Sequence, residues 1–151
     1  MTTSARIIPY KVQPAALELL LGFSKGVEAL GLPDRLNDLI HLRASQLNGC
    51  AACVAMHARE AREHGEHQYR LDLLPVWRET EAFDERERAA LAWTEVLTQI
   101  PTAGVDDPAY RDLVAAFGEN DAVTVTLAVI VINCWNRMNV GFRVPLPRNP
   151  T

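Results

Sequence analysis

Two cysteines and a histidine, Cys50, Cys53 and His57, lie within one short stretch that directly follows an Asn-Gly pair. On an α-helix, at about 100° per residue, the three positions fall within roughly 60° of one another and share a face. A cysteine in the first turn of a helix lies near the positive end of the helix dipole, and a neighbouring histidine can accept its proton. Both effects favour the thiolate, which is the reactive form of cysteine. The spacing therefore predicts a site for thiol chemistry.

Two kinds of site use these residue types, a redox-active dithiol and a metal centre. Redox chemistry needs a thiolate that attacks and a second cysteine close enough to form a disulfide with the resulting sulfenic acid, and the CxxC spacing meets that need. His57, one turn after Cys53, can act as the base directly or through one water. Structural zinc needs four protein ligands, and no second Cys/His pair has ligand spacing, although His41 or Asp38 could complete a metal site. We expect a dithiol without metal or organic cofactor, rather than a metal site or two inert core cysteines.

The composition is that of an ordinary globular protein, and it limits the partners. With 151 residues the chain has the size of one domain. The formal net charge of -4 gives no general attraction to nucleic acid or to anionic lipid, so we expect neither as a partner. The N-terminal residues lack the order of a signal peptide, and an odd number of cysteines with two in a CxxC fits a reducing compartment. The longest apolar run, 122–134, is too short to span a membrane. We therefore expect a soluble, cytoplasmic protein.

The elements that position the dithiol are predicted to be helices. Apolar residues recur at helical spacing along most of the chain, and prolines and glycines mark where the segments begin and end. The expected helices cover about 14–30, 33–48, 50–65, 84–101, 107–117 and 123–140, with two short pieces joined at Pro75 in 67–80. Asp84 and Glu87 have the spacing of a capping box, and Asp107-Pro108 has that of a cap followed by proline. Residues 1–13 are expected to form an extended arm and residues 144–151 an extended tail.

The last helix and two further side chains carry expectations of their own. The alternation at 123–126 is typical of a strand, but the apolar stretch is too long for one and has no strand partner, so we expect a helix buried in the domain or at a subunit interface. Arg43 lies near the apolar stripe of its helix, which indicates either a stem over apolar surface or a buried pairing with a carboxylate. Cys134 is expected to be an inert core thiol.

The stretch from Leu42 to His57 resembles the core motif of the AhpD-like alkylhydroperoxidases, which belong to the carboxymuconolactone decarboxylase superfamily. The segments 83–94 and 132–143 are also similar to single-domain members. The resemblance implies an all-α fold, an AhpD-like bundle of about six to eight helices that occupies residues 1–151 as one domain. It also implies assembly into a homo-oligomer, such as a dimer, trimer or hexamer.

The same resemblance implies a function and a role for each site residue. It implies an antioxidant oxidoreductase, a peroxidase that reduces hydroperoxides through its redox-active disulfide and is restored by an external dithiol, a thioredoxin-like or a lipoyl-type reductant. Cys53 would attack the peroxide, Cys50 would resolve the sulfenic acid, and His57 would relay protons. The family relay also uses a glutamate twelve residues before the first cysteine, where this chain has Asp38. Well-characterised peroxidases of the family carry histidine where this chain has Ala52.

Two alternatives follow from the same residues. One is an acid/base enzyme like the decarboxylases of the superfamily, which act on a lactone acid and do not need a CxxC. The other is a non-catalytic oligomeric module that binds a small apolar ligand or senses redox state through the Cys50–Cys53 pair.

Overall fold

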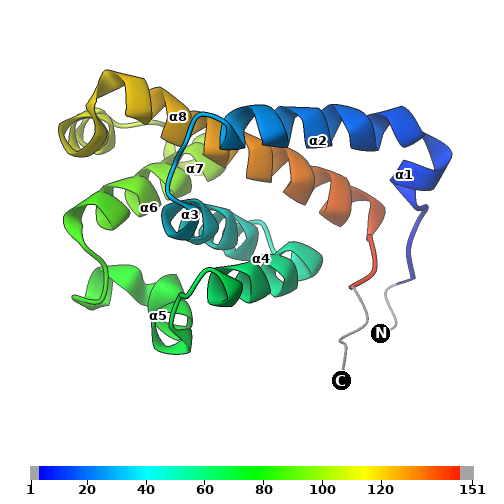
Figure 1. Ribbon diagram of the computed structural model, residues 1–151, viewed down its shortest axis with the longest axis horizontal. Coiled ribbons are helices and arrows are strands. Elements are labelled where there is room, and N and C mark those ends of the chain that lie inside the picture. Colours follow the sequence, from blue (N-terminus) through cyan, green and yellow to red (C-terminus); the bar gives the residue numbers. More distant parts are fainter. Residues whose placement is uncertain (1–3, 147–151) are drawn as a thin grey trace.

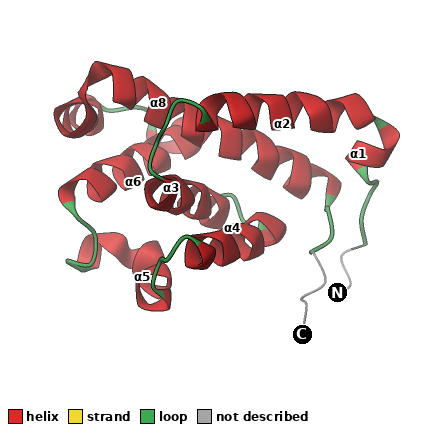
Figure 2. Cartoon of the chain, in the orientation of Figure 1, coloured by secondary structure: helices red, strands yellow, loops and turns green. Residues whose placement is uncertain are grey.

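The computed structural model describes residues 4–146, and in this part of the chain every element is a helix (Figures 1 and 2). The helices are α1 (Pro9–Val12), α2 (Pro14–Glu28), α3 (Asp34–Leu47), α4 (Ala51–Glu63), α5 (Gln68–Leu73), the 3₁₀ helix η1 (Leu74–Glu79), α6 (Glu85–Thr98), α7 (Ile100–Ala103) and α8 (Asp107–Phe142). The predicted all-α fold is confirmed. The expected extended arm contains one helical turn, α1, and residues 147–151 of the expected tail lie outside the described residues.

Helix α3 is the centre of the fold and packs against α4, α6 and α8 (Figure 1). Its side chains enter two separate clusters of buried apolar residues. Leu36 and Ile40 join the cluster formed with α2, α6 and α8, while Leu39 and Leu42 join the cluster formed with α4, α5, η1 and α6. Leu39 is fully buried. Because α3 is apolar on two faces, it holds the helices that carry the thiols and their neighbours in fixed positions.

Local signals in the sequence end and begin the helices. Asp84 accepts from the backbone N–H of Glu87 and Glu87 accepts from that of Asp84, each at 2.9 Å, so the predicted capping box is confirmed at the start of α6. At the start of α8 the cap lies one residue earlier than predicted. Asp106 accepts from the backbone N–H of Ala109 at 2.9 Å, and Asp107 is already helical. The N-cap is therefore Asp106, because its carboxylate reaches the backbone N–H of the third helical residue.

Helix α8 is interrupted at Gly118, whose backbone adopts φ 73° and ψ 167°. Residues with a Cβ rarely adopt this conformation, so glycine is required where the helix changes direction. The break matches the two separate helices that were expected over 107–117 and 123–140. By length and composition α8 could cross a membrane, but its buried residues, among them Val125 and Val129, form part of the core cluster with α3 and α6. In this fold α8 is a core helix.

Helix α2 is the least covered of the long helices. Its sequence is rich in leucine and alanine, yet Val27 is its only buried residue. Leu19 and Leu21 are both exposed, Leu19 to 75%. In Figure 1, α2 runs alongside the second half of α8 and contacts it. Leu19 and Leu21 lie on either side of the packed face and remain exposed.

Candidate functional site

The two cysteines lie at the turn between α3 and α4. Helix α3 ends at Leu47, Gly49 follows the C-cap Asn48 with a left-handed φ of 65°, and the backbone N–H of Cys50 donates to Ser45 O at 3.0 Å. This is the glycine-terminated helix end that lets the chain reverse within two residues. Cys50 is the N-cap of α4, and its sulfur accepts from the backbone N–H of Cys53 at 3.3 Å. The sulfur thus occupies the place where Ser or Asp usually caps a helix.

Cys50 and Cys53 form a disulfide and are almost completely buried, with exposed fractions of 2% and 1%. A thiolate formed at Cys50 would lie at the positive end of the α4 dipole and accept a backbone N–H, and both effects stabilise it. The pairing of Cys50 with Cys53 that the CxxC spacing predicts is therefore sterically possible in this fold. The start of α4 also favours a thiolate at Cys50.

A network of buried amides fixes the turn that carries the cysteines. Asn48 Nδ2 donates to Asn133 Oδ1 at 3.0 Å and to Asn136 Oδ1 at 2.8 Å, which ties the turn to α8. Asn136 in turn donates to Ser45 Oγ at 3.0 Å, and Asn133 donates to Thr98 Oγ1 on α6 at 3.0 Å. Because buried amides are costly to leave unpaired, this network specifies one position for the turn. The polar residues inside the apolar run of α8 were the sequence signal for it, and sequence reasoning did not use them.

His57 lies one turn after Cys53 on α4 and is oriented by Glu60. Its Nδ1 lies 2.9 Å from Glu60 Oε2. This hydrogen bond lowers the pKa of Glu60, so at neutral pH the carboxylate accepts and Nδ1 carries the proton. In neutral imidazole the lone pair then lies on Nε2, the atom that can accept a proton. His57 Nε2 is buried and has no hydrogen-bond partner among the described residues.

A second imidazole, His41 from α3, faces His57. The ring centroids are 4.9 Å apart and the rings meet edge to face. Burial, together with the neighbouring His57, lowers the pKa of His41 to about 3, so His41 is neutral at physiological pH. Its Nε2 is also buried without a partner among the described residues. The sequence had indicated His41 only as a metal ligand, and no group of three His, Cys, Asp or Glu side chains in residues 4–146 is placed to hold a metal ion.

Asp38, the other predicted site residue, is hydrogen-bonded to His64, which follows the last residue of α4. Asp38 Oδ2 accepts from His64 Nδ1 at 2.7 Å. Burial raises the pKa of Asp38, while the hydrogen bond raises the pKa of the exposed His64. Asp38 lies within electrostatic reach of His57 and Glu60, but the structure brings Glu60 rather than Asp38 into hydrogen-bond contact with His57.

The end of α8 contributes a hydrogen bond to the dithiol. Asn139 Nδ2 donates to Cys53 Sγ at 3.3 Å, and Asn139 Oδ1 accepts from the hydroxyl of Tyr10, on α1, at 3.3 Å. No sequence pattern pointed to either residue, because the contacts join positions that are 86 and 129 residues apart. Cys53 is therefore linked to α8 directly through Asn139 and to α1 indirectly through Tyr10.

Comparison with known proteins identifies the family of this chain. The sequence profile described as the carboxymuconolactone decarboxylase family matches residues 14–96, a segment that spans α2 to α6 and includes the dithiol. The chain belongs to this family.

Relatives of this carboxymuconolactone decarboxylase family member match nearly the whole chain. The uncharacterized protein YdfG of Bacillus subtilis (strain 168) is 32% identical over 138 residues, 91% of this chain and 94% of its own. A protein of unknown function from Agrobacterium tumefaciens, ATU0492, described as a candidate antioxidant defence protein AhpD, is 40% identical with a TM-score of 0.92 over 95% of this chain and 99% of that one. The predicted AhpD-like resemblance and helical fold are thus confirmed.

The debrominase Bmp8 shares the fold alone. Its apo structure has a TM-score of 0.81 and 20% identity over 91% of this chain and 74% of that chain. The C82A variant of Bmp8 in complex with 2,3,4-tribromopyrrole gives a TM-score of 0.82 at 19% identity. The family fold is therefore preserved at low sequence identity, and the site must be judged from its own residues.

Away from the dithiol, the carboxylate of Glu95 on α6 is bonded to side chains of α3 and η1. Arg43 Nε donates to Glu95 Oε1 at 2.7 Å, Arg43 Nη2 forms an ion pair with the same oxygen at 2.7 Å, and Trp77 Nε1 donates to it at 2.9 Å. Arg78 donates to the other carboxylate oxygen. These bonds lower the pKa of Glu95 despite its burial. Of the two expectations for Arg43, the buried pairing with a carboxylate is confirmed. Cys134 is unpaired and half-buried rather than a fully buried core thiol.

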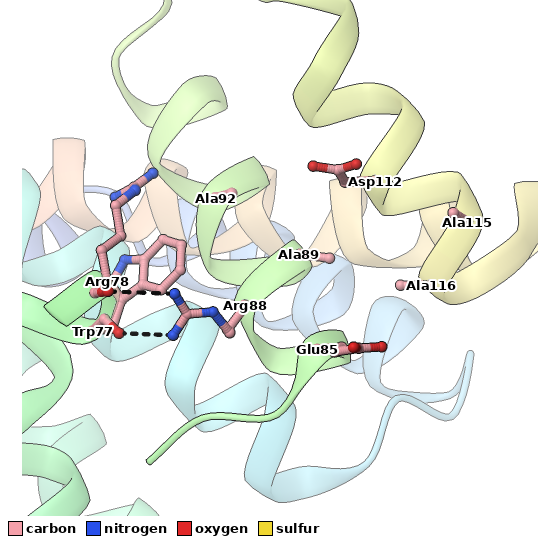
Figure 3. Close-up of a pocket in the computed structure, with 9 residues that line it drawn as sticks. All are labelled: Trp77, Arg78, Glu85, Arg88, Ala89, Ala92, Asp112, Ala115 and Ala116. Atoms are coloured by element: carbon pink, nitrogen blue, oxygen red, sulfur yellow. Dashed lines mark hydrogen bonds between the residues drawn. The ribbon is translucent and has the colours of Figure 1, made fainter. Parts of the chain in front are cut away.

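An open groove of about 660 Å³ lies between α6 and the first half of α8 (Figure 3). Arg88 crosses one wall and donates to the backbone carbonyls of Trp77 at 3.1 Å and Arg78 at 3.4 Å. Four alanines and the side chains of Glu85 and Asp112 line the rest. None of the predicted site residues lines this groove, and its arginines are engaged in contacts within the fold. The groove is therefore separate from the dithiol.

Proposed function

We propose that the protein is a thiol-dependent peroxidase that reduces hydroperoxides through the Cys50–Cys53 dithiol. The observation that carries the proposal is the disulfide between these residues, next to an imidazole whose Nε2 is unpartnered among the described residues and whose Nδ1 is held by Glu60. A nucleophile, a partner that traps its oxidised form and an oriented base are the parts that such a reaction needs.

The proposed reaction begins with the reduced protein. His57 Nε2 accepts the thiol proton of Cys53, and the thiolate attacks the terminal oxygen of the hydroperoxide. A sulfur–oxygen bond forms, the oxygen–oxygen bond breaks, and the alkoxide leaves as an alcohol after it takes the proton from His57. Cys53 is now a sulfenic acid. The dithiol supplies both electrons of this reduction.

Cys50 completes the cycle. As the N-cap of α4 it is stabilised as a thiolate, and its sulfur attacks Cys53 to form the disulfide while hydroxide leaves and is protonated to water. An external dithiol, which we expect to be a thioredoxin-like or lipoyl-type protein, then reduces the disulfide by thiol–disulfide exchange. The resemblance assigns a part of the proton relay to Asp38, whereas the hydrogen bond to His57 favours Glu60 for that part.

The assembly and the location form part of the same proposal. We expect residues 1–151 to act as one domain in a cytoplasmic homo-oligomer. The exposed Leu19 and Leu21 of α2 support the oligomer, because they provide apolar surface for contact with another subunit.

The test uses the reduced protein and one equivalent of an organic hydroperoxide. Intact mass should fall by two hydrogens, and peptide mapping should locate the new bond between Cys50 and Cys53. With excess dithiol the wild type should consume hydroperoxide repeatedly, Cys53→Ser should not, and Cys50→Ser should accumulate a sulfenic acid at Cys53. Full activity of Cys53→Ser, or no reaction with peroxide, would overturn the proposal.

A second candidate uses His57 and Glu60 without the thiols. This pair is an oriented general base, so an acid/base reaction of the decarboxylase type would need only these two side chains. Activity on a lactone acid that survives replacement of both cysteines would identify it. A single oxidation of Cys50 and Cys53 that no dithiol reverses catalytically would instead indicate a redox sensor.

A further inference from the structure

We infer that Asn139 controls the reactivity of Cys53 by donating a hydrogen bond to its sulfur, and that Tyr10 holds the Asn139 amide in the orientation that this requires. The inference rests on the proposed function in taking Cys53 as the reacting sulfur. It assigns Asn139 as a residue in direct contact with the reacting atom and Tyr10 as a positioning residue.

The contact is suited to the reduced state of the site. Asn139 Nδ2 lies 3.3 Å from Cys53 Sγ. A disulfide sulfur is a weak acceptor, whereas a thiolate carries a full negative charge, so the same hydrogen bond strengthens when the disulfide opens. A carboxamide does not titrate, and Asn139 therefore remains a donor at every pH at which the protein is folded.

Tyr10 decides which end of the amide faces the sulfur. The amide of asparagine can be placed in two ways, and its neighbours determine which is stable. The hydroxyl of Tyr10 donates to Asn139 Oδ1 at 3.3 Å, which directs the oxygen away from Cys53 and the NH₂ group towards it. Burial raises the pKa of Tyr10, so its hydroxyl keeps its proton at physiological pH. The opposite placement would set a carbonyl oxygen against the thiolate.

Contacts with α8 hold the N-terminal segment that carries Tyr10 in place. The backbone N–H of Arg6 donates to Phe142 O at 3.0 Å, and Arg6 Nη1 donates to Gly141 O at 2.9 Å, so the segment is tied to the end of α8. The Tyr10 ring lies 6.0 Å from the ring of Trp135, whose Nε1 donates to Ser24 Oγ at 2.9 Å. Residues 6–10 are therefore part of the support of the thiol site.

Four polar side chains near the dithiol or Asn139 titrate, unlike Asn139 itself and the asparagines of the turn network. They are His57 and Glu60 from α4, His41 from α3 and Tyr10 from α1. Loss of a titrating group would add or remove an inflection in the pH dependence of Cys53. Loss of Asn139 should shift the existing thiol inflection and leave the shape of the curve unchanged.

The experiment measures the rate at which iodoacetamide alkylates Cys53, from pH 5 to 10, without any peroxide. Cys50 and Cys134 are replaced by serine so that Cys53 is the only thiol. Three variants in this background are compared: Asn139→Leu, which removes the donor; Asn139→Asp, which keeps the shape but places a carboxylate near the sulfur; and Tyr10→Phe, which keeps the ring. Ser24→Ala is the matched control, since it removes the hydrogen bond to Trp135 without touching Asn139.

We expect Asn139→Leu to raise the midpoint of the thiol titration by about one pH unit, which makes alkylation about tenfold slower below the midpoint. Asn139→Asp should raise it further, Tyr10→Phe should give about a threefold loss, and Ser24→Ala should match the parent. The inference is wrong if both Asn139 variants, folded by circular dichroism, keep the parental titration curve. If instead the Asn139 effects appear while the wild type consumes no peroxide, the proposed function fails and this inference stands.

Discussion

Replacing Glu60 by glutamine tests whether the base of the site is set by the tertiary structure. The Glu60 carboxylate accepts from His57 Nδ1 at 2.9 Å, which keeps the lone pair on Nε2 and fixes the orientation of the ring. A hydrogen bond to a charged group contributes about 1.5–3 kcal/mol. The Glu60 side chain is 35% exposed, so solvent screening reduces this to about 1–1.5 kcal/mol. If that free energy is lost from the transition state, Glu60→Gln should slow the attack on peroxide about five- to thirteenfold.

The assay is a single turnover of the reduced protein with excess hydroperoxide, quenched in acid and scored by mass as disulfide formed against time. Glu63→Gln is the matched control, because Glu63 lies on the same helix, is 64% exposed and pairs only with Arg59 in the described structure. Its rate should equal that of the wild type. A wild-type rate in Glu60→Gln together with a tenfold loss in Asp38→Asn would refute the assignment and would place the relay at Asp38, as the resemblance implies.

Three further predictions concern stability. Leu39→Ala should lower the free energy of unfolding by about 2–5 kcal/mol in urea titration, since Leu39 is fully buried in the cluster with α4 and α6; a loss below 1 kcal/mol would contradict that packing. Gly118→Ala should cost about 1–3 kcal/mol because of its φ of 73°, whereas Gly22→Ala, in the middle of α2 with open space around the new Cβ, should stabilise by about 0.5–1 kcal/mol; equal effects would exclude the backbone argument. His64 has a raised pKa in the folded state, so its pair with Asp38 stabilises the protein below the unfolded histidine pKa and loses this effect as pH rises through the folded pKa. Melting temperatures should show this loss between about pH 6 and 8 in the wild type and not in His64→Gln.

Much of the fold could be predicted because its signals are local. The periodicity of apolar residues, together with glycines and prolines at segment ends, located α2 to α6 and the two halves of α8 to within a few residues, but it did not predict the short helix α7. The capping box at Asp84 and Glu87 was readable because both partners lie within one turn. The predicted N-cap of α8 was wrong by one residue. Asp106 and Asp107 are neighbouring carboxylates, and the cap is the one that reaches the free backbone N–H in the folded chain.

The sequence by itself determined the reactive face of the site. Cys50, Cys53 and His57 must lie together once this segment is helical, since their spacing follows the helical repeat. Even the partner of His57, Glu60, is three residues away on the same helix and was within reach of this argument.

Only the tertiary structure decided what surrounds that face. Asp38 lies at the position that the relay of the family uses. Helix packing nevertheless brings His64 into hydrogen-bond contact with Asp38, whereas His57 pairs with Glu60. Asn139 contacts Cys53 and Tyr10 contacts Asn139 from the opposite end of the chain, and no local pattern encodes contacts across such separations. The physical reason is that helix geometry is a property of neighbouring residues. Donors and carboxylates around a sulfur, in contrast, are placed by the packing of helices that meet only in the folded chain.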